Sequence, residues 1–108
     1  MEMSENEKNL HKAIVQQWNI PSETGLMNHE LLDALTNQVA RLIESDLNKL
    51  MTAMYTLDID EVRFADAMRL PGKDMVSRAV AELILEREIQ KMDMRRRYEA
   101  SRPDAIDE

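Results

Sequence analysis

The stretch LLDALTNQVARLIESDLNKLMTAMYTL, residues 31–57, decides the fold. Its apolar residues recur every three or four positions, which is the period of an α-helix. The stripe consists of Leu32, Leu35, Val39, Ile43, Leu47, Leu50, Met54 and Leu57, and it is widened by Leu31, Leu42, Met51 and Tyr55. We predict one long helix over residues 28–57, capped by Asn28, with an apolar face broad enough to pack against two or more neighbours.

A shorter helix is predicted before this stretch. Ser4 and Glu7 match a capping box, in which two side chains satisfy free amides at the start of a helix. Pro21 and Gly25 end the helix, because neither continues the helical hydrogen-bond ladder comfortably. One side of this helix carries Leu10, Ala13, Ile14 and Trp18.

Two more helices are predicted after residue 57. Asp58 and Glu61 resemble a second N-terminal cap, followed by a short helix that carries Val62, Ala65 and Met68. Residues 70–73, Leu-Pro-Gly-Lys, form a turn. Asp74 is then predicted to cap the last helix, which runs to about residue 98.

Composition also favours a helical protein. Only two glycines and three prolines occur in 108 residues, and strand-rich folds need many such turn residues. Hydrophobic residues make up 44% and charged residues 32%, a balance typical of globular chains. We predict an all-α fold, a small bundle of about four helices, two long and two short. A single helical domain is expected over residues 1–99, with a frayed polar tail over residues 100–108.

The predicted core combines the long helix with the last one. Its residues should be buried together: Leu35, Val39, Ile43, Leu47, Leu50, Val76, Val80 and Leu83. The carboxylates of the last helix, Glu82, Glu86 and Glu88, are expected on a solvated face with intrahelical ion pairs.

The last helix carries apolar residues on two opposed sides. Leu85, Ile89 and Met92 point away from the side of Val76 and Val80, because successive residues turn by about 100°. Either the first helix covers this second face or another chain does. We predict a homodimer that self-associates through Leu85, Ile89 and Met92, since two-fold dimers dominate among oligomers.

A basic cluster lies near the end of the same helix, at Lys91, Arg95, Arg96 and Arg97. Cations there stabilise the helix dipole, and they are also candidates for contact with a polyanion. The net charge of −7 opposes attraction to phosphate backbones. The leading hypothesis is therefore a non-enzymatic interaction module with a possible protein partner, and the alternative is a nucleic-acid-binding regulator that uses this cluster.

No catalytic or metal-binding motif is present in the sequence. Neither His11 nor His29 follows a glutamate by three positions, as a di-iron bundle requires. Serine occurs in no Gly-x-Ser-x-Gly setting, and two glycines are too few for the usual phosphate-binding loop. The chain also contains no cysteine. Because all these motifs are missing, we predict neither enzymatic activity nor a cofactor.

Location is predicted from the same features. No apolar run approaches the ~20 residues that cross a bilayer, so no membrane association is expected. The N-terminal MEMSENEKN is acidic and polar, unlike a secretory signal. The expected location is the cytoplasm.

Two stretches carry a resemblance. LMTAMYTLDIDE at 50–61 and AELILEREIQK at 81–91 resemble segments of short helical bacterial proteins that have no assigned function. The similarity covers about the C-terminal two thirds of the chain and rests on composition. It implies a bacterial helical protein and carries no site residue over.

Overall fold

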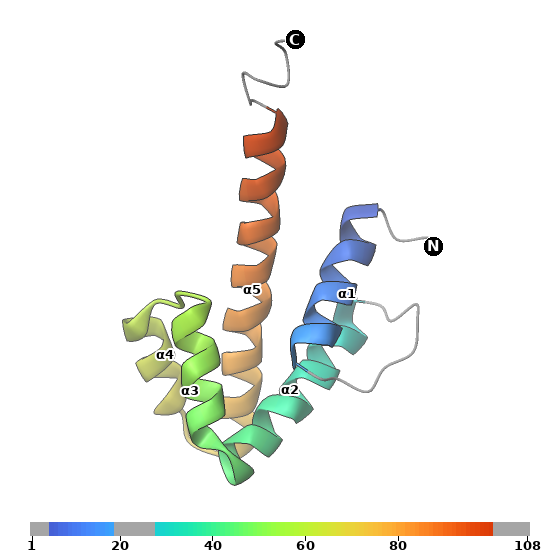
Figure 1. Cartoon of the computed structure of the whole chain (residues 1–108). Helices are drawn as coiled ribbons and strands as arrows, with labels where there is room; N and C mark the ends of the chain where they lie inside the picture. The colour runs from blue at the N-terminus through green and yellow to red at the C-terminus, as the bar shows by residue number, and fades with distance from the viewer. Residues whose placement is uncertain (1–4, 19–27, 101–108) are drawn as a thin grey trace.

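The computed structural model describes residues 5–18 and 28–100, which form five α-helices and no strand (Figure 1). The predicted all-α fold is confirmed, with one helix more than expected. The predicted tail lies outside the described residues except for Ala100, the last residue of α5. The helices are α1 (Glu5–Trp18), α2 (Asn28–Ser45), α3 (Leu47–Thr56), α4 (Glu61–Met68) and α5 (Lys73–Ala100).

The additional helix arises because the predicted long helix is interrupted at Asp46. The backbone of Asp46 leaves the helical region, with φ −156° and ψ 72°, and its carboxylate accepts a hydrogen bond from the Lys49 amide at 3.2 Å. An aspartate in this role caps a new helix. The chain changes direction there, so α2 and α3 form a V (Figure 1). One continuous helix over 28–57 was therefore a wrong prediction.

The end of α3 is a Schellman motif. The Ile59 amide donates to the Met54 carbonyl at 3.1 Å, and the Asp58 amide donates to the Tyr55 carbonyl at 3.0 Å. Asp58 adopts the left-handed conformation that this motif requires, with φ 61°. The prediction that Asp58 caps the next helix is wrong, because the residue instead ends the preceding one.

Two residues start the last helices. Asp60 caps α4, and its carboxylate accepts from the Val62 amide at 3.0 Å. The Gly72 carbonyl accepts from the Val76 amide at the start of α5, and Gly72 has φ 107°, where L side chains are strained. The helix begins at Lys73, so Asp74 lies inside its first turn and the prediction that Asp74 caps it is wrong. Ser4, the predicted cap of α1, lies outside the described residues.

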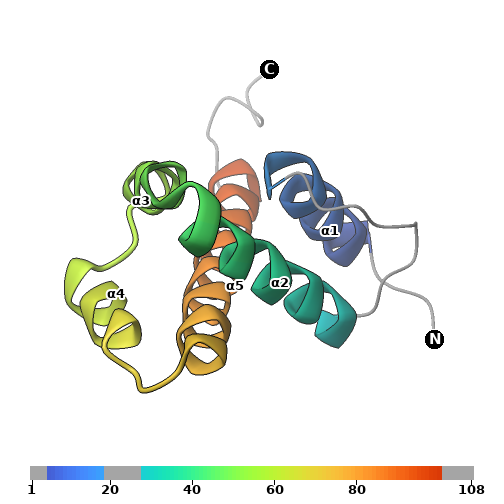
Figure 2. The same ribbon diagram turned by 90° about the horizontal axis from the view of Figure 1, so that it is seen from below.

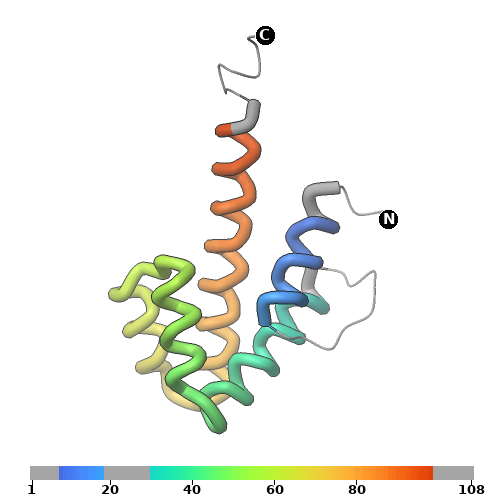
Figure 3. Tube along the Cα trace, in the orientation of Figure 1, coloured from blue at the N-terminus to red at the C-terminus, as the bar shows by residue number. Residues whose placement is uncertain are grey.

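The first half of α5 is the centre of the molecule. α2 lies across it and makes the most extensive contact, as the view from below shows (Figure 2). α1 packs on α5 and α2 on one side, whereas α3 and α4 lie on the other side (Figures 1 and 2). The C-terminal end of α5 extends beyond all four neighbours (Figure 3).

The core joins all five helices, and most predicted core residues belong to it. Leu35, Val39, Leu50, Val80 and Leu83 are buried, while Ile43 and Val76 pack against them in partly buried positions. The exception is Leu47, which is 43% exposed, so its predicted burial is wrong. The physical reason is the break at Asp46, after which the first turn of α3 stands at the tip of the V.

In the short helices α1 and α4, too, only some of the apolar residues are buried. Leu10, Ile14 and Trp18 of α1 are buried, but Ala13 is exposed. In α4, Ala67 is buried and Met68 is partly buried, whereas Val62, another apolar residue of the predicted helix, is exposed. A helix of eight residues buries only the narrow side that touches its neighbour.

Candidate interaction surfaces

The predicted self-association residues divide between the core and the surface. Leu85 and Met92 are partly buried and pack against the core cluster. Ile89 remains 39% exposed. Because α1 packs on α5, the first helix covers part of the second apolar face, which was the alternative left open by the sequence. Self-association through these residues stays a prediction.

The predicted basic cluster lies on the projecting end of α5. Arg95, Arg96 and Arg97 are exposed, and Lys91 is partly buried. Arg96 forms an ion pair at 3.4 Å with Asp93, three residues before it on the same helix. The end of α5 therefore presents a concentration of positive charge on a chain whose net charge is −7.

Apolar side chains accompany these cations. Met94 is 54% exposed and Tyr98 is 68% exposed. Both lie within residues 94–98 of α5, all of which are exposed. Neither residue had a predicted role, although their spacing of four positions places them on one side of a helix.

A second apolar surface lies on α3. Leu47, Met51 and Tyr55 follow one another at intervals of four residues, and Tyr55 is 83% exposed. We call these three residues the α3 stripe. On the predicted continuous helix, Leu47 belonged to the expected core, and Met51 and Tyr55 widened the same apolar face. The signal that could have separated them is Ser45-Asp46, because both residue types favour helix ends over helix interiors.

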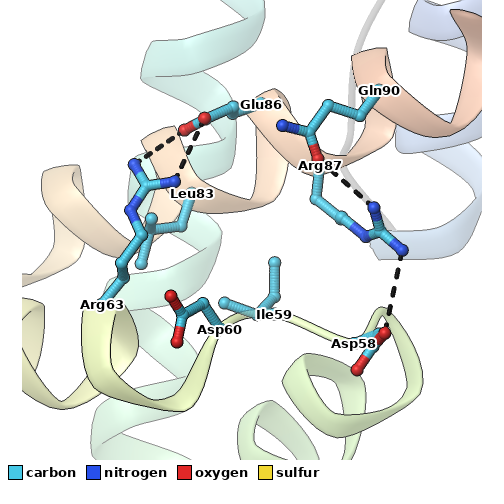
Figure 4. Close-up of a pocket in the computed structure, with 8 residues that line it drawn as sticks. All are labelled: Asp58, Ile59, Asp60, Arg63, Leu83, Glu86, Arg87 and Gln90. Carbon is cyan, nitrogen blue, oxygen red and sulfur yellow. Dashed lines mark hydrogen bonds and ion pairs between the residues drawn. The ribbon is translucent and has the colours of Figure 1, made fainter.

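Two arginines connect α5 to the end of α3 and to α4, around a cavity of about 130 Å³ (Figure 4). Arg63 of α4 donates two hydrogen bonds to Glu86, at 2.9 and 3.1 Å. Arg87 Nε donates to the Leu57 carbonyl at 2.9 Å, which satisfies an acceptor at the end of α3. We call Arg63, Glu86, Arg87 and Leu57 the clasp.

The charges of the clasp are already matched. The hydrogen bonds from Arg63 lower the pKa of Glu86 below its ordinary value, and they raise the pKa of Arg63. Arg87 also contacts Gln90 at 3.3 Å and Asp58 at 3.9 Å. Bidentate pairing of this kind fixes two helices relative to each other. The clasp is therefore a structural device, which sequence spacing had not revealed because its members are 23 to 30 residues apart.

Glu88 lies at the boundary between the packed and the projecting parts of α5. It is only 6% exposed, and its Oε2 atom has no hydrogen-bond partner. Burial raises the pKa of Glu88, while the nearby Lys91, Arg95 and Arg87 oppose that rise. The prediction that Glu88 belongs to a solvated face is wrong. Glu88 instead lies on the buried side of α5, which begins at Ser77.

Among residues 8–18 and 30–98, whose side chains are described, no three metal-binding side chains gather into a site. His11 is buried in α1. His29 opens α2, and its side chain lies outside the described set. Within the same described ranges, the charged side chains that line the clasp cavity are paired except for Asp60, and the lining contains no serine, histidine or cysteine.

Comparison with protein-family models, curated proteins and solved structures finds no match to this chain. None of the helices in the described part is both long and apolar enough to cross a bilayer.

Proposed function

We propose that this chain is a non-enzymatic helical assembly module that self-associates through the projecting end of α5. The observation that carries the proposal is the exposure of Met94 and Tyr98 on a helix that extends beyond its own bundle. Ile89, the exposed member of the predicted face, lies on the side of α5 opposite Tyr98, because nine residues turn the helix by about 180°, so it stays outside this contact. The proposal places the module in the cytoplasm, because a cysteine-free composition suits a reducing compartment.

The shape of the chain supports the proposal. The molecule extends over 54 × 32 × 20 Å, and its Cα radius of gyration is 15.6 Å, against about 13 Å expected for a compact chain of this length. The difference reflects a helical end that few neighbours stabilise. Helical segments of about a dozen residues are only marginally stable in water without packing, so a partner would stabilise this end.

The energy available is sufficient for association. Burial of a large apolar side chain contributes about 1.5–3 kcal/mol, and Met94 and Tyr98 both retain exposed apolar surface. In a two-fold dimer each contact occurs twice, which doubles the gain. Against this stands the cost of association, which is several kcal/mol, so a dimer of micromolar stability is the expected outcome.

Sedimentation velocity at tens of micromolar protein tests the proposal directly. The wild type should sediment as a dimer, and Met94→Glu should shift it towards a folded monomer. Met75→Glu is the matched control, because Met75 is similarly exposed at the opposite end of the same helix. A wild type that sediments as a monomer throughout this range would overturn the proposal.

The alternative function, nucleic-acid binding, rests on the exposure of Arg95, Arg96 and Arg97 at one tip. Binding of that kind weakens steeply with salt, because phosphate contacts release counterions. Fluorescence anisotropy with a labelled duplex, measured from low to physiological salt, separates the two functions. Binding that persists at physiological salt and is lost when the three arginines are replaced by alanine would favour the alternative.

A further inference from the structure

The projecting end of α5 has an ordered face. Lys91, Met94, Arg95 and Tyr98 are spaced by three, four and seven positions from the first, so they lie on one side of the helix. We call these four residues the α5 stripe. It alternates apolar and cationic side chains, and a surface with that composition fits an apolar partner bordered by carboxylates.

The α3 stripe has the complementary composition. Its three apolar side chains are bordered by Asp46 at the start of the helix and by Asp58, Asp60 and Glu61 after its end, all of them exposed. Residues 44–61 contain five carboxylates and one lysine. Residues 91–98, in contrast, contain four cations and one carboxylate.

The lengths of the two surfaces also correspond. Arg87 binds the Leu57 carbonyl, so the end of α3 is level with Arg87 on α5. Beyond that level α5 continues through residues 88–100, about 20 Å at 1.5 Å per residue, and the ten residues of α3 span about 15 Å. The α5 end therefore begins where α3 stops and is long enough to cover it.

We infer that the α5 stripe of one copy docks on the α3 stripe of a second copy, reciprocally, in a two-fold dimer. α3 and α5 run in similar directions within one chain (Figures 1 and 3). A two-fold axis near the level of Arg87 therefore inverts the second copy and brings each α5 end antiparallel to the partner's α3. Such an exchange closes on itself and forms no open polymer.

A second acidic surface in the same chain is less suitable as the acceptor. The groove between α4 and α5 has a volume of about 370 Å³ and is lined by Asp66, Glu82 and Glu86. Its carboxylates are neutralised within the chain, because Glu86 pairs with Arg63, Asp66 with Arg69, and Glu82 with Arg78. Of the five carboxylates in residues 44–61, Glu44 pairs with Lys73 and Asp58 with Arg87. No ion pair is found for the other three, Asp46, Asp60 and Glu61, among the described residues.

The inference rests on the proposed self-association and is tested by exchanging charge between the two stripes. Arg95→Glu places a carboxylate against the acidic surroundings of α3, and Met51→Lys places a cation against the α5 stripe. Each variant alone should weaken dimerisation by about tenfold or more, since each puts like charges together. Both positions are exposed, so circular dichroism should show unchanged helicity.

Mixing the two variants provides the decisive measurement. In the mixed dimer one contact is of wild-type character and the other pairs Glu at position 95 with Lys at position 51. Equimolar Arg95→Glu and Met51→Lys should therefore form a heterodimer within about threefold of wild-type affinity. Sedimentation equilibrium with one variant fluorescently labelled measures this, and Met75→Lys in place of Met51→Lys is the control that should not recover binding to Arg95→Glu.

The possible failures are distinguishable. A monomeric wild type overturns the proposed function itself. A wild-type dimer that Met51→Lys leaves unchanged overturns the docking on α3 while self-association stands. Dimers weakened by each single variant but not recovered on mixing also overturn the inference, because the two stripes then do not face each other.

Discussion

The two halves of α5 differ in what surrounds them, although they belong to one uninterrupted helix. In the first half, Val80, Ala81 and Ile84 are fully buried among the other four helices. In the second half, residues 94–98 are all exposed. The length of a helix and the extent of its packing are therefore determined by different factors. Helical propensity and periodicity continue through residue 98, but the neighbouring helices end earlier.

The largest expected effect is the difference in the free energy of unfolding between two isoleucine variants, one in each half of α5. Ile84→Ala removes a fully buried side chain and should lower the free energy of unfolding by about 2–5 kcal/mol. Ile89→Ala should lower it by less than about 1 kcal/mol, because that side chain already contacts water. Urea unfolding monitored by circular dichroism, at a protein concentration below the dimerisation range, measures both. Equal losses would mean that the two halves are packed alike.

Glu88 marks the boundary between the halves, and Glu88→Gln should stabilise the protein at neutral pH. The pKa of Glu88 is raised in the folded state, so the folded chain binds the proton more tightly than the unfolded chain. Stability is therefore greatest below the unfolded pKa, falls as pH rises through the folded pKa, and stays lowered above it. Glutamine has the shape of the protonated acid and removes this loss.

Unfolding experiments between pH 4 and pH 8, for wild type and Glu88→Gln, follow this effect. The difference between the two proteins should grow with pH over the interval that begins at the ordinary glutamate pKa of about 4.3. Glu82→Gln on the exposed side of the same helix is the control and should show no such growth. A Glu88→Gln protein that is less stable than wild type at pH 7 would indicate that the carboxylate is held in its charged form.

A smaller effect is expected at Asp58, where α3 ends beside the boundary. Asp58→Gly should raise the free energy of unfolding by about 0.5–1 kcal/mol, because glycine adopts a positive φ without steric cost. Asp58→Ala is the matched comparison and should lose stability relative to glycine. If the glycine variant is less stable than wild type, the 3.9 Å contact with Arg87 outweighs the backbone strain.

The smallest effect concerns the clasp, which joins the packed half of α5 to α4. The pKa of Glu86 should lie below its ordinary value in the wild type and return towards it in Arg63→Gln, because the hydrogen bonds from Arg63 cause the shift. Stability from this pair is present above the unfolded pKa and is lost as pH falls through the folded pKa. An NMR titration of the Glu86 carboxyl carbon measures the shift. The exposed position of the pair keeps the change in stability small.

Local sequence patterns predicted the positions of most helices along the chain well. They predicted less well which faces of those helices are buried. The ends of α1 and the turn at residues 70–73 follow from proline, glycine and periodicity, and the structure places them close to the expected positions. The break at Asp46 was missed, because the apolar spacing continues through it without interruption. For that reason Leu47 is exposed against its predicted burial, and Met51 and Tyr55, which were predicted to widen the apolar face, are exposed with it. The clasp was beyond sequence reasoning, since ion pairs between distant residues leave no local signal.

The sequence by itself determined that this chain is helical and where most helices begin and end, because capping and periodicity act within a few residues. The tertiary structure alone decided which apolar residues are buried, because burial depends on where another helix lies. It covered Leu85 and Met92, left Ile89 and the α3 stripe exposed, and enclosed Glu88. These outcomes follow from the lengths and directions of the neighbours of α5, which no pattern along α5 itself contains.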